Sequence, residues 1–251
     1  MSAALILLAG LTGAIVGSFL TVVAHRLPRG ESVVAPRSQC PTCGVQIAAY
    51  DNVPVLSWVL LRGRSRCCSE GISGRYPLAE GSLAVLFAAV AVRFHDDLGA
   101  ALLGMVFVAM LVTITLTDLE RRIIPNRVLV VATAIGLFVV ALSDPSSLPE
   151  RVAAAAGAGG LLFAAALAYP GGMGMGDVKL AAAMGFFLGV AVLPALLVAL
   201  LAGSLVGIAM IVREGGAARK RAIPFGPFLA IGGVTGLLAG QALIDAYLTT
   251  F

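Results

Sequence analysis

Long uncharged apolar segments alternate with short polar stretches along almost the whole chain. The first segment covers residues 3–24 without a charge, and about 20 apolar residues suffice for a helix to cross a bilayer. Pro194 divides one continuous apolar run into two. The further segments are 78–92, 98–117, 128–142, 152–168, 180–193, 194–212 and 223–247. This pattern predicts an all-α polytopic membrane protein with about eight transmembrane helices.

The first apolar segment is expected to stay attached as a membrane helix. A cleaved secretory signal carries its basic residues before a shorter apolar core, whereas here His25, Arg26 and Arg29 follow the apolar residues.

The composition of the chain as a whole excludes an ordinary water-soluble protein, because 59% of the residues are hydrophobic, 12% are charged, and the mean hydropathy is +1.01. Fifteen of the 17 Lys and Arg residues fall in alternate loops, at 25–77, 119–127, Lys179 and 213–221. The positive-inside rule places these loops in the cytosol and both termini outside it. Basic residues dispersed over membrane loops do not form a nucleic-acid surface, so no nucleic acid is expected as a partner.

One cytosolic insert, residues 25–77, is long enough to hold structure of its own, and it contains all four cysteines. We therefore divide the chain into a first helix (1–24), this insert and a seven-helix membrane domain (78–251). Disulfides are rare in a reducing cytosol, so zinc is the favoured interpretation of Cys40, Cys43, Cys67 and Cys68. Two alternatives stay open: only one of the adjacent Cys67 and Cys68 binds the metal, or both are ordinary small side chains.

Four carboxylates lie in or beside the apolar segments, where ionisable groups are costly and often functional: Glu80, Asp118, Asp177 and Asp245. Asp245 can reach the outer interface. Glu80 lies about one turn into its helix, where it can simply complement the helix dipole.

Asp118 and Asp177 are the stronger candidates for chemistry. Asp177 precedes an apolar segment, so it is either a helix N-cap or a catalytic group. Asp118 ends an apolar segment, where a negative charge opposes the helix dipole and capping does not explain it. The predicted topology places both at the cytosolic face, and side-by-side packing of their helices would bring the two carboxylates together.

Two adjacent carboxylates share one proton near neutral pH. The ionised one can then activate a water molecule, while the protonated one donates to a peptide carbonyl. The helix dipole suggests Asp177 as the readier anion and Asp118 as the partner that is more easily protonated. The glycines of the preceding segment, Gly171, Gly172, Gly174 and Gly176, would let an extended substrate approach the pair closely.

The stretch Gly174-Met175-Gly176-Asp177-x-Lys179 resembles the GxGD signature of intramembrane aspartyl proteases, and its setting resembles the bacterial type IV prepilin peptidases. Further stretches extend the resemblance over nearly the whole chain: Gly17 to Pro28, the insert with its Cys-Pro-Thr-Cys motif and Asn52-Val53-Pro54, 72–77 with Glu80, Asp118 with Pro125-Asn126, and Pro224-Phe225-Gly226-Pro227-Phe228.

The resemblance implies a bifunctional enzyme of the bacterial cytoplasmic membrane. It would cleave the basic leader of type IV prepilins or pseudopilins after a glycine, with Asp118 and Asp177 catalytic and Gly174, Gly176 and Lys179 in the active-site loop. It would then methylate the new N-terminus with S-adenosylmethionine, an activity associated with the insert. The partners expected are these substrates and the lipid bilayer.

The insert departs from the family pattern, because Ser65 stands where the third cysteine is expected and Cys67 is its possible replacement. A peptidase with reduced or lost methyltransferase activity is therefore the alternative. Two other classes are remote: an ion-coupled transporter, which predicts carboxylates at mid-membrane, and a zinc docking module, in which Asp118 would be dispensable.

Overall fold

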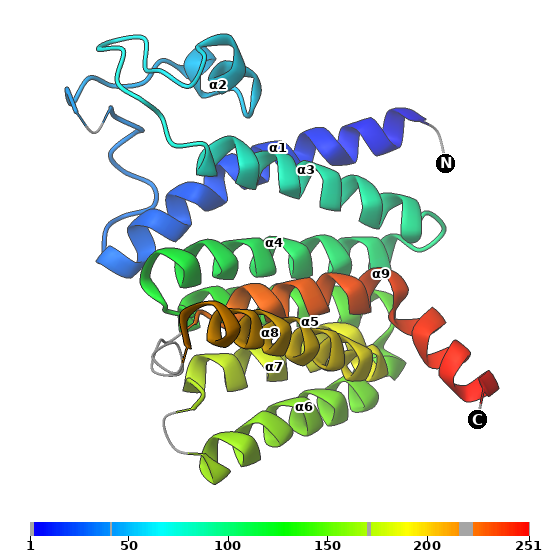
Figure 1. Cartoon of the computed structure of the whole chain (residues 1–251). Helices are drawn as coiled ribbons and strands as arrows, with labels where there is room; N and C mark the ends of the chain where they lie inside the picture. The colour runs from blue at the N-terminus through cyan, green and yellow to red at the C-terminus, as the bar shows by residue number, and fades with distance from the viewer. Residues whose placement is uncertain (1–2, 41, 170–171, 216–222, 251) are drawn as a thin grey trace. The chain divides into compact units, whose positions relative to one another are not determined.

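The computed structural model describes residues 3–40, 42–169, 172–215 and 223–250. Within these residues the chain is helical and has no β-strand, which confirms the all-α prediction (Figure 1). Contacts divide the chain into two compact units, residues 1–96 and 97–251.

Eight long helices carry the apolar segments of the described residues: α1 (Ala3–Arg26), α3 (Arg75–Arg93), α4 (Leu98–Arg121), α5 (Asn126–Ser143), α6 (Leu148–Ala168), α7 (Met175–Leu188), α8 (Val192–Glu214) and α9 (Gly226–Thr250). By length and hydropathy they form seven candidate membrane spans, because α7 and α8 together make up one continuous apolar segment, Met175–Glu214. That segment nevertheless holds two helices, as the packing of α9 shows.

Glycines of α9 touch both α7 and α8. A Cβ on Gly236 would meet Leu188 of α7 and Ala195 of α8. One turn earlier in α9, a Cβ on Gly232 would meet Ala199, and a Cβ on Gly233 would meet Met184. Contacts on α8 thus run in the opposite direction to those on α7. The chain therefore reverses at the short helix η4 (Gly189–Ala191), and the two apolar segments form two helices, as predicted.

The first unit pairs α1 with α3. Gly17 of α1 lies against the backbone of Glu80, and a Cβ there would come within 2.9 Å of the Glu80 Cα. Small residues let two helix backbones approach closely in a membrane. The domain boundary expected at residue 78 thus differs from the division by contacts, which keeps α3 with α1; the functional division remains a prediction.

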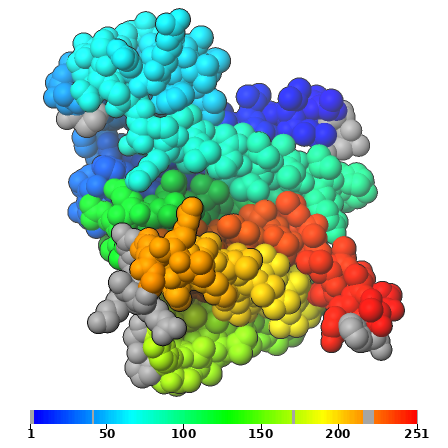
Figure 2. All heavy atoms as spheres, viewed as in Figure 1, coloured from blue at the N-terminus to red at the C-terminus, as the bar shows by residue number. Residues whose placement is uncertain are grey.

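The insert between α1 and α3 contains the short helices η1 (Leu27–Arg29), η2 (Ala49–Asn52) and α2 (Leu56–Leu60). Trp58 is its central side chain: its Nε1 donates to the Ile72 carbonyl at 2.9 Å, and its ring lies against Gly63. In the space-filling view the insert forms a compact cyan lobe (Figure 2).

The second unit is built around α4, α7 and α9. Its buried core includes Phe107, Leu111 and Ile114 of α4, with Met184 of α7 and Leu229 of α9. The rings of Phe107 and Phe187 stack with centroids 5.1 Å apart. These contacts fix the ends of the three helices relative to one another, and the candidate site lies at one such end.

Candidate active site and cysteine cluster

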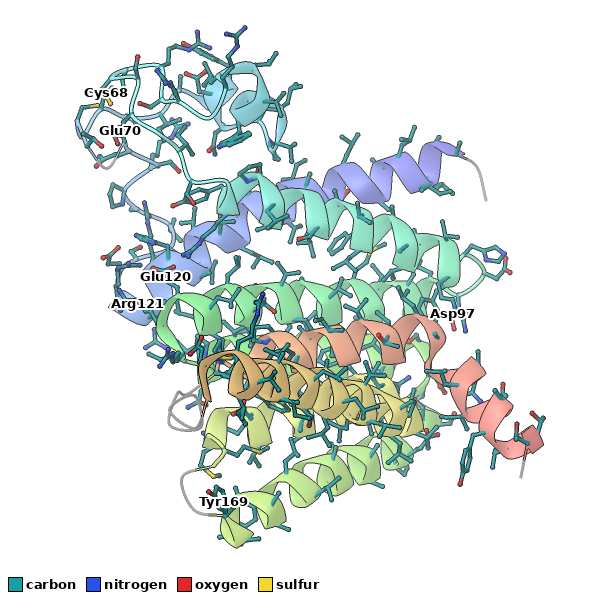
Figure 3. The ribbon with its side chains drawn as sticks, viewed as in Figure 1. Cys68, Glu70, Asp97, Glu120, Arg121 and Tyr169 are labelled. Carbon is teal, nitrogen blue, oxygen red and sulfur yellow. The ribbon has the colours of Figure 1, made fainter. Side chains whose placement is uncertain are left out.

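The C-terminal end of α4 carries Asp118, which is buried, with 5% of its surface exposed. The helix stops at Arg122, whose left-handed backbone (φ 55°) lets its N–H cap the Asp118 carbonyl. Glu120 and Arg121 follow Asp118 at this end, while Asp97 marks the other end of α4 (Figure 3). Arg122 is close enough for its positive charge to act on the Asp118 carboxylate.

The N-terminus of α9 supplies the direct partner of Asp118. The Gly226 N–H donates to Asp118 Oδ2 at 2.8 Å. A Cβ on Gly226 would lie 2.7 Å from the same oxygen, so only glycine leaves room for this contact. Gly226 belongs to the Pro-Phe-Gly-Pro-Phe stretch, to which the sequence assigned no role.

Asp177 lies in the first turn of α7, which begins at Met175 rather than near Leu180 as the apolar pattern suggested. Its Oδ2 accepts the Gly174 N–H at 3.2 Å, and its own N–H donates to the Gly174 carbonyl at 3.1 Å. Asp177 therefore caps the helix from inside the first turn, while Gly174 is the N-cap residue. The capping role does not exclude a catalytic one, because one carboxylate oxygen suffices for it.

Asp118 and Asp177 lie at the same end of the second unit, where the charge of Asp118 acts on Asp177, although no hydrogen bond joins the two carboxylates in the described residues. Each carboxylate also faces a helix N-terminus, α9 for Asp118 and α7 for Asp177, where partial positive charge stabilises an anion. From the sequence, only the unfavourable C-terminal end of α4 was evident beside Asp118. With α9 included, dipoles alone no longer distinguish the anion from the protonated partner.

The glycine segment is partly helical and closely packed. Gly176 lies within α7, and a Cβ there would come within 3.0 Å of Ile124, in the connection between α4 and α5. Gly171 lies outside the described residues. Lys179 Nζ bonds to Asn126 Oδ1 at 3.1 Å and so joins α7 to the start of α5. Both residues line one end of an apolar cleft of about 720 Å³ between α5, α6 and α7.

Glu80 is explained by the insert rather than by the helix dipole. It is buried, and its Oε2 accepts the Val55 N–H at 2.7 Å. Val55 has a positive φ of 60°, which is unusual for a β-branched residue. Glu80 thus holds a strained turn of the insert against α3.

The cysteines lie on two turns with the same hydrogen-bond pattern, the first at 40–45 and the second at 65–70. In the first turn Cys40 N donates to Val45 O and Gly44 N to Cys40 O, both at 2.9 Å. In the second, Ser65 N donates to Glu70 O at 2.8 Å and Ser69 N to Ser65 O at 2.9 Å. Ser65 therefore occupies the position of Cys40, and Cys68 that of Cys43.

All four sulfurs nevertheless come together, within 4.8 Å of one another. Cys40 and Cys68 are 3.5 Å apart, Cys43 and Cys67 3.2 Å, and Cys67 and Cys68 3.9 Å. Four sulfurs about 2.3 Å from a zinc ion in a tetrahedron would be separated by nearly 4 Å. The adjacent Cys67 and Cys68 can therefore both reach one metal ion. Figure 3 labels Cys68 in the insert.

The electrostatics of this cysteine cluster favour a cation. The backbone N–H groups of Cys43 and Thr42 lower the pKa of Cys40 to about 6, so this thiol is ionised at neutral pH. Although the Val45 N–H acts to lower it, the pKa of Cys43 is raised to about 12 because its thiol is bonded to Cys67. Four thiols crowded this closely cannot all lose their protons unless a positive ion balances the charge of the thiolates.

Two family models match the chain. Residues 11–94 match the bacterial peptidase A24 N-terminal domain, and residues 105–212 match the type IV leader peptidase family. No solved structure matches the chain.

Several curated proteins are similar over nearly their whole length, and each is named "Prepilin leader peptidase/N-methyltransferase". The protein of Bacillus subtilis is 36% identical over 240 residues, covering 94% of this chain and 95% of its own. That of Aeromonas hydrophila is 36% identical, covering 94% and 91%, and that of Pectobacterium carotovorum is 37% identical, covering 91% of both. The chain therefore belongs to the type IV leader peptidase family.

Proposed function

We propose that this protein cleaves the leader of type IV prepilins or pseudopilins after a glycine, at the cytosolic membrane face, and then methylates the new N-terminus. The peptidase and N-methyltransferase activities are those of the family to which the chain belongs. The observation that carries the proposal for this chain is the approach of Asp118 and Asp177 at one end of the second unit.

Asp118 and Asp177 act as the catalytic pair. In this mechanism the two carboxylates share one proton, so one is a base and the other an acid at the same time. The ionised carboxylate removes a proton from water, which attacks the carbonyl carbon of the scissile peptide bond. The protonated partner donates a hydrogen bond to the carbonyl oxygen as negative charge develops there. The tetrahedral intermediate then collapses as the C–N bond breaks, and the departing amine takes the proton that the base removed from water. No step needs a covalent intermediate with the enzyme.

The N-termini of α7 and α9 support this chemistry. The Gly174 and Gly226 N–H groups each hold one carboxylate oxygen, which keeps both side chains in one rotamer and leaves their other oxygens for water and substrate. Gly174, Gly176 and Lys179 form the loop and first turns beside which an extended substrate lies. Preorganised groups of this kind avoid the cost of reorientation during the reaction.

The cytosolic face is the end of the membrane domain that carries both aspartates. The positive-inside distribution of Lys and Arg supports this orientation and leaves both termini on the other side. A prepilin would present its basic leader to the anionic cytosolic leaflet, with its apolar helix in the bilayer.

Zinc held by Cys40, Cys43, Cys67 and Cys68 is part of the proposal. Thiolates in this number and spacing fit a closed structural site, in which zinc contributes to folding rather than to catalysis. S-adenosylmethionine would supply the methyl group, which passes from its sulfur to the amine that cleavage exposes.

The alternative of a peptidase without methylation rested on the irregular cysteines. This alternative is disfavoured because the sulfurs of Cys67 and Cys68 both lie in the cysteine cluster. The transporter alternative is disfavoured because Asp118 lies in the last turn of α4 and Asp177 in the first turn of α7, not at mid-helix.

The test is reaction of the reconstituted protein with a prepilin, followed by mass spectrometry with and without S-adenosylmethionine. We expect loss of the leader in both reactions and one added methyl group only when the donor is present. An intact prepilin would overturn the proposal, and a cleaved but unmethylated product would restrict it to the peptidase.

A further inference from the structure

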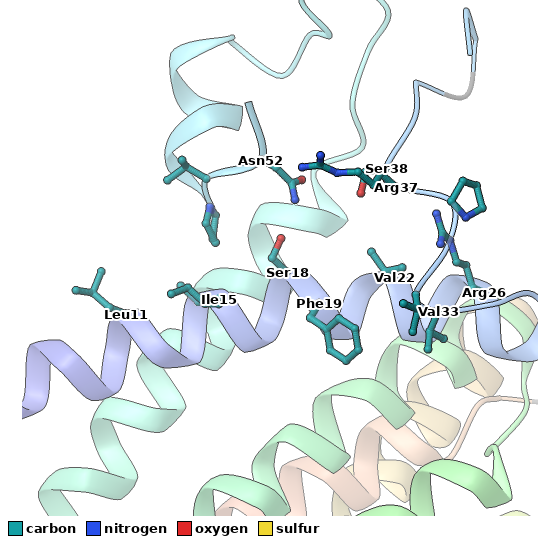
Figure 4. Close-up of a pocket in the computed structure, with 15 residues that line it drawn as sticks. Leu11, Ile15, Ser18, Phe19, Val22, Arg26, Val33, Arg37, Ser38 and Asn52 are labelled. Carbon is teal, nitrogen blue, oxygen red and sulfur yellow. The ribbon is translucent and has the colours of Figure 1, made fainter. Parts of the chain in front are cut away.

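A groove of about 590 Å³ lies within the first unit, between α1 and the insert. One wall is α1, with Ala14, Ser18 and Phe19, and the other is formed by residues 33–38 and 52–54. Figure 4 shows Ser18 pointing from α1 toward the wall that carries Asn52 and Arg37. We call it the α1 groove. Neither Asp118 nor Asp177 is among the residues that line it.

Two stretches that gave the family resemblance meet in the α1 groove. Gly17 to Pro28 contributes Ser18, Phe19 and Arg26, and the insert contributes Asn52 with Val53 and Pro54. The sequence singled out both stretches, but neither the aspartate pair nor the cysteine cluster accounts for them. Their convergence on one hollow suggests that they share a ligand.

The lining has the character of a small-molecule site. Its volume falls within the about 300–1,000 Å³ typical of ligand pockets, and it combines an apolar surface with a few polar groups. Arg37 has no hydrogen-bond or ion-pair partner among the described residues, so its guanidinium is available for a carboxylate. The Ser18 hydroxyl and the Asn52 amide can hydrogen-bond.

We propose that the α1 groove is the S-adenosylmethionine site. The inference rests on the proposed methyltransferase activity and gives it a location. Arg37 binds the carboxylate of the methionine part, Ser18 and Asn52 bond to polar atoms of the nucleoside, and the apolar wall covers the purine.

The insert wall is held firmly enough to form a site in advance. Val55 N–H donates to Glu80 Oε2 at 2.7 Å, which ties the end of the 52–54 wall to α3. The Ser57 hydroxyl accepts the Val53 N–H at 3.1 Å and donates to Tyr50 O at 2.9 Å. A wall whose backbone is fixed in this way loses little entropy when a ligand binds.

The cysteine cluster braces both parts of this wall. Ser38, at the end of the 33–38 segment, accepts the Ile47 N–H at 2.9 Å and leads directly into the first cysteine turn. The second cysteine turn is joined to Asp51, next to Asn52, by Arg66, whose Nε and Nη2 donate at 2.9–3.1 Å. A metal ion in the cluster would therefore stabilise the groove without touching its ligand.

The direct test is photolabelling of the full-length protein in lipid nanodiscs with S-adenosylmethionine tritiated in its methyl group, followed by mapping of the labelled peptides. We expect the label on α1 near Ser18 or on residues 33–38 and 52–54, and we expect unlabelled S-adenosylhomocysteine to prevent it. Label confined to residues 97–251 would overturn the assignment. Because wild-type protein is used, no variant needs to fold.

Binding of the same probe to matched variants gives a second readout. Loss of a charge-assisted hydrogen bond weakens binding by roughly tenfold to a hundredfold, so Arg37→Ala should raise the dissociation constant by that factor, whereas Arg62→Ala should not. Ala14→Phe, which fills the groove, should abolish binding, whereas Ala4→Phe on the same helix should not. Unchanged binding in both groove variants would overturn the proposal.

Cleavage of a prepilin by each variant separates this inference from the proposed function. Groove variants that cleave normally but bind S-adenosylmethionine weakly support the assignment. If wild-type protein methylates its product and the label maps outside the groove, the activity stands and the site is wrong. If wild-type protein cleaves but neither binds the donor nor methylates, the methyltransferase function fails and this inference with it.

Discussion

Gly226 decides how Asp118 is held. Its N–H donates to Asp118 Oδ2, and its missing side chain leaves the space that the carboxylate occupies. Asp118 thereby gains the favourable end of α9 in place of the unfavourable end of α4. A residue with no chemistry of its own therefore sets the position of a proposed catalytic group.

Gly226→Ala is expected to lower cleavage strongly. The new Cβ would lie 2.7 Å from Asp118 Oδ2 and displace the carboxylate, and a displacement of about 1 Å can reduce the rate about a hundredfold. The measurement is kcat for a prepilin peptide in reconstituted membranes. Gly207→Ala in α8 is the control, because its Cβ would meet nothing within 4 Å. Equal activities of the two variants would contradict the account.

The two cysteine turns predict how single substitutions change the zinc content of the protein. Ser65→Ala should retain one zinc ion per chain, because Cys67 replaces the missing sulfur of the second turn. Cys68→Ser should lose the ion or bind it much more weakly, since it removes one of four thiolates. The number of zinc ions per chain in each purified variant, measured by mass spectrometry, tests both expectations. Loss of zinc in Ser65→Ala alone would mean that the serine is a ligand.

The sequence predicted these residues unevenly. Asp118 and Asp177 could be found because charges beside apolar segments are costly and both map to one face. Gly226 could not, because its constraint comes from a residue 108 positions away. The partner of Glu80 was missed for the same reason, since the Val55 N–H lies in another element and only the fold brings it near.

Among the elements, the pair α6 and α7 determines where Asp177 lies. Arg151, in the first turn of α6, donates from Nη1 to the carbonyls of Phe186 and Phe187 at 3.2 and 2.9 Å. Basic side chains at this position satisfy the last carbonyls of a helix. α7 has only 14 residues, so a shift at this capped end would reach the aspartate at the other.

Arg151→Met should therefore lower the free energy of unfolding by about 1–3 kcal/mol, the usual contribution of charged hydrogen bonds of this kind. Titration with SDS in mixed micelles, followed by far-UV circular dichroism, would measure it. Arg127→Met is the matched control, because Arg127 is exposed and has no bonded partner among the described residues. A loss of the same size in both variants would show that the cap contributes nothing specific.

Element boundaries also show where sequence patterns stop being informative. The apolar segments predicted all eight long helices, and Pro194 correctly suggested a division, but the reversal lies earlier, at Gly189–Ala191. The start of α7 was placed too late because glycines are poor helix formers. Their place in the helix follows from close packing, here of Gly176 against Ile124.

In the whole molecule, the two proposed activities belong to different units. The aspartates lie in the unit of residues 97–251, while the cysteine cluster and the α1 groove lie in the unit of residues 1–96. Metal-dependent order in the first unit need not affect chemistry in the second. The two activities should therefore respond differently to removal of zinc.

Treatment with a zinc chelator should lower methylation by about tenfold or more while cleavage changes little, because loss of a structural metal unfolds the segments that it holds. The rates are followed on one prepilin, by product mass for the methyl group and by gel mobility for the leader. Restoration of methylation by added zinc is the control. Parallel loss of both activities would contradict the separation.

The central claim is that Asp118 and Asp177 together hydrolyse the leader peptide. The most direct test is cleavage of a prepilin in reconstituted membranes by Asp118→Asn and Asp177→Asn. Asp245→Asn is the control, because Asp245 is exposed and, among the described residues, bonds only to the neighbouring Gln241. We predict that each of the first two variants folds, still binds S-adenosylmethionine and does not cleave, while the control cleaves like the wild type. Normal cleavage by a folded Asp118→Asn or Asp177→Asn protein would contradict the account.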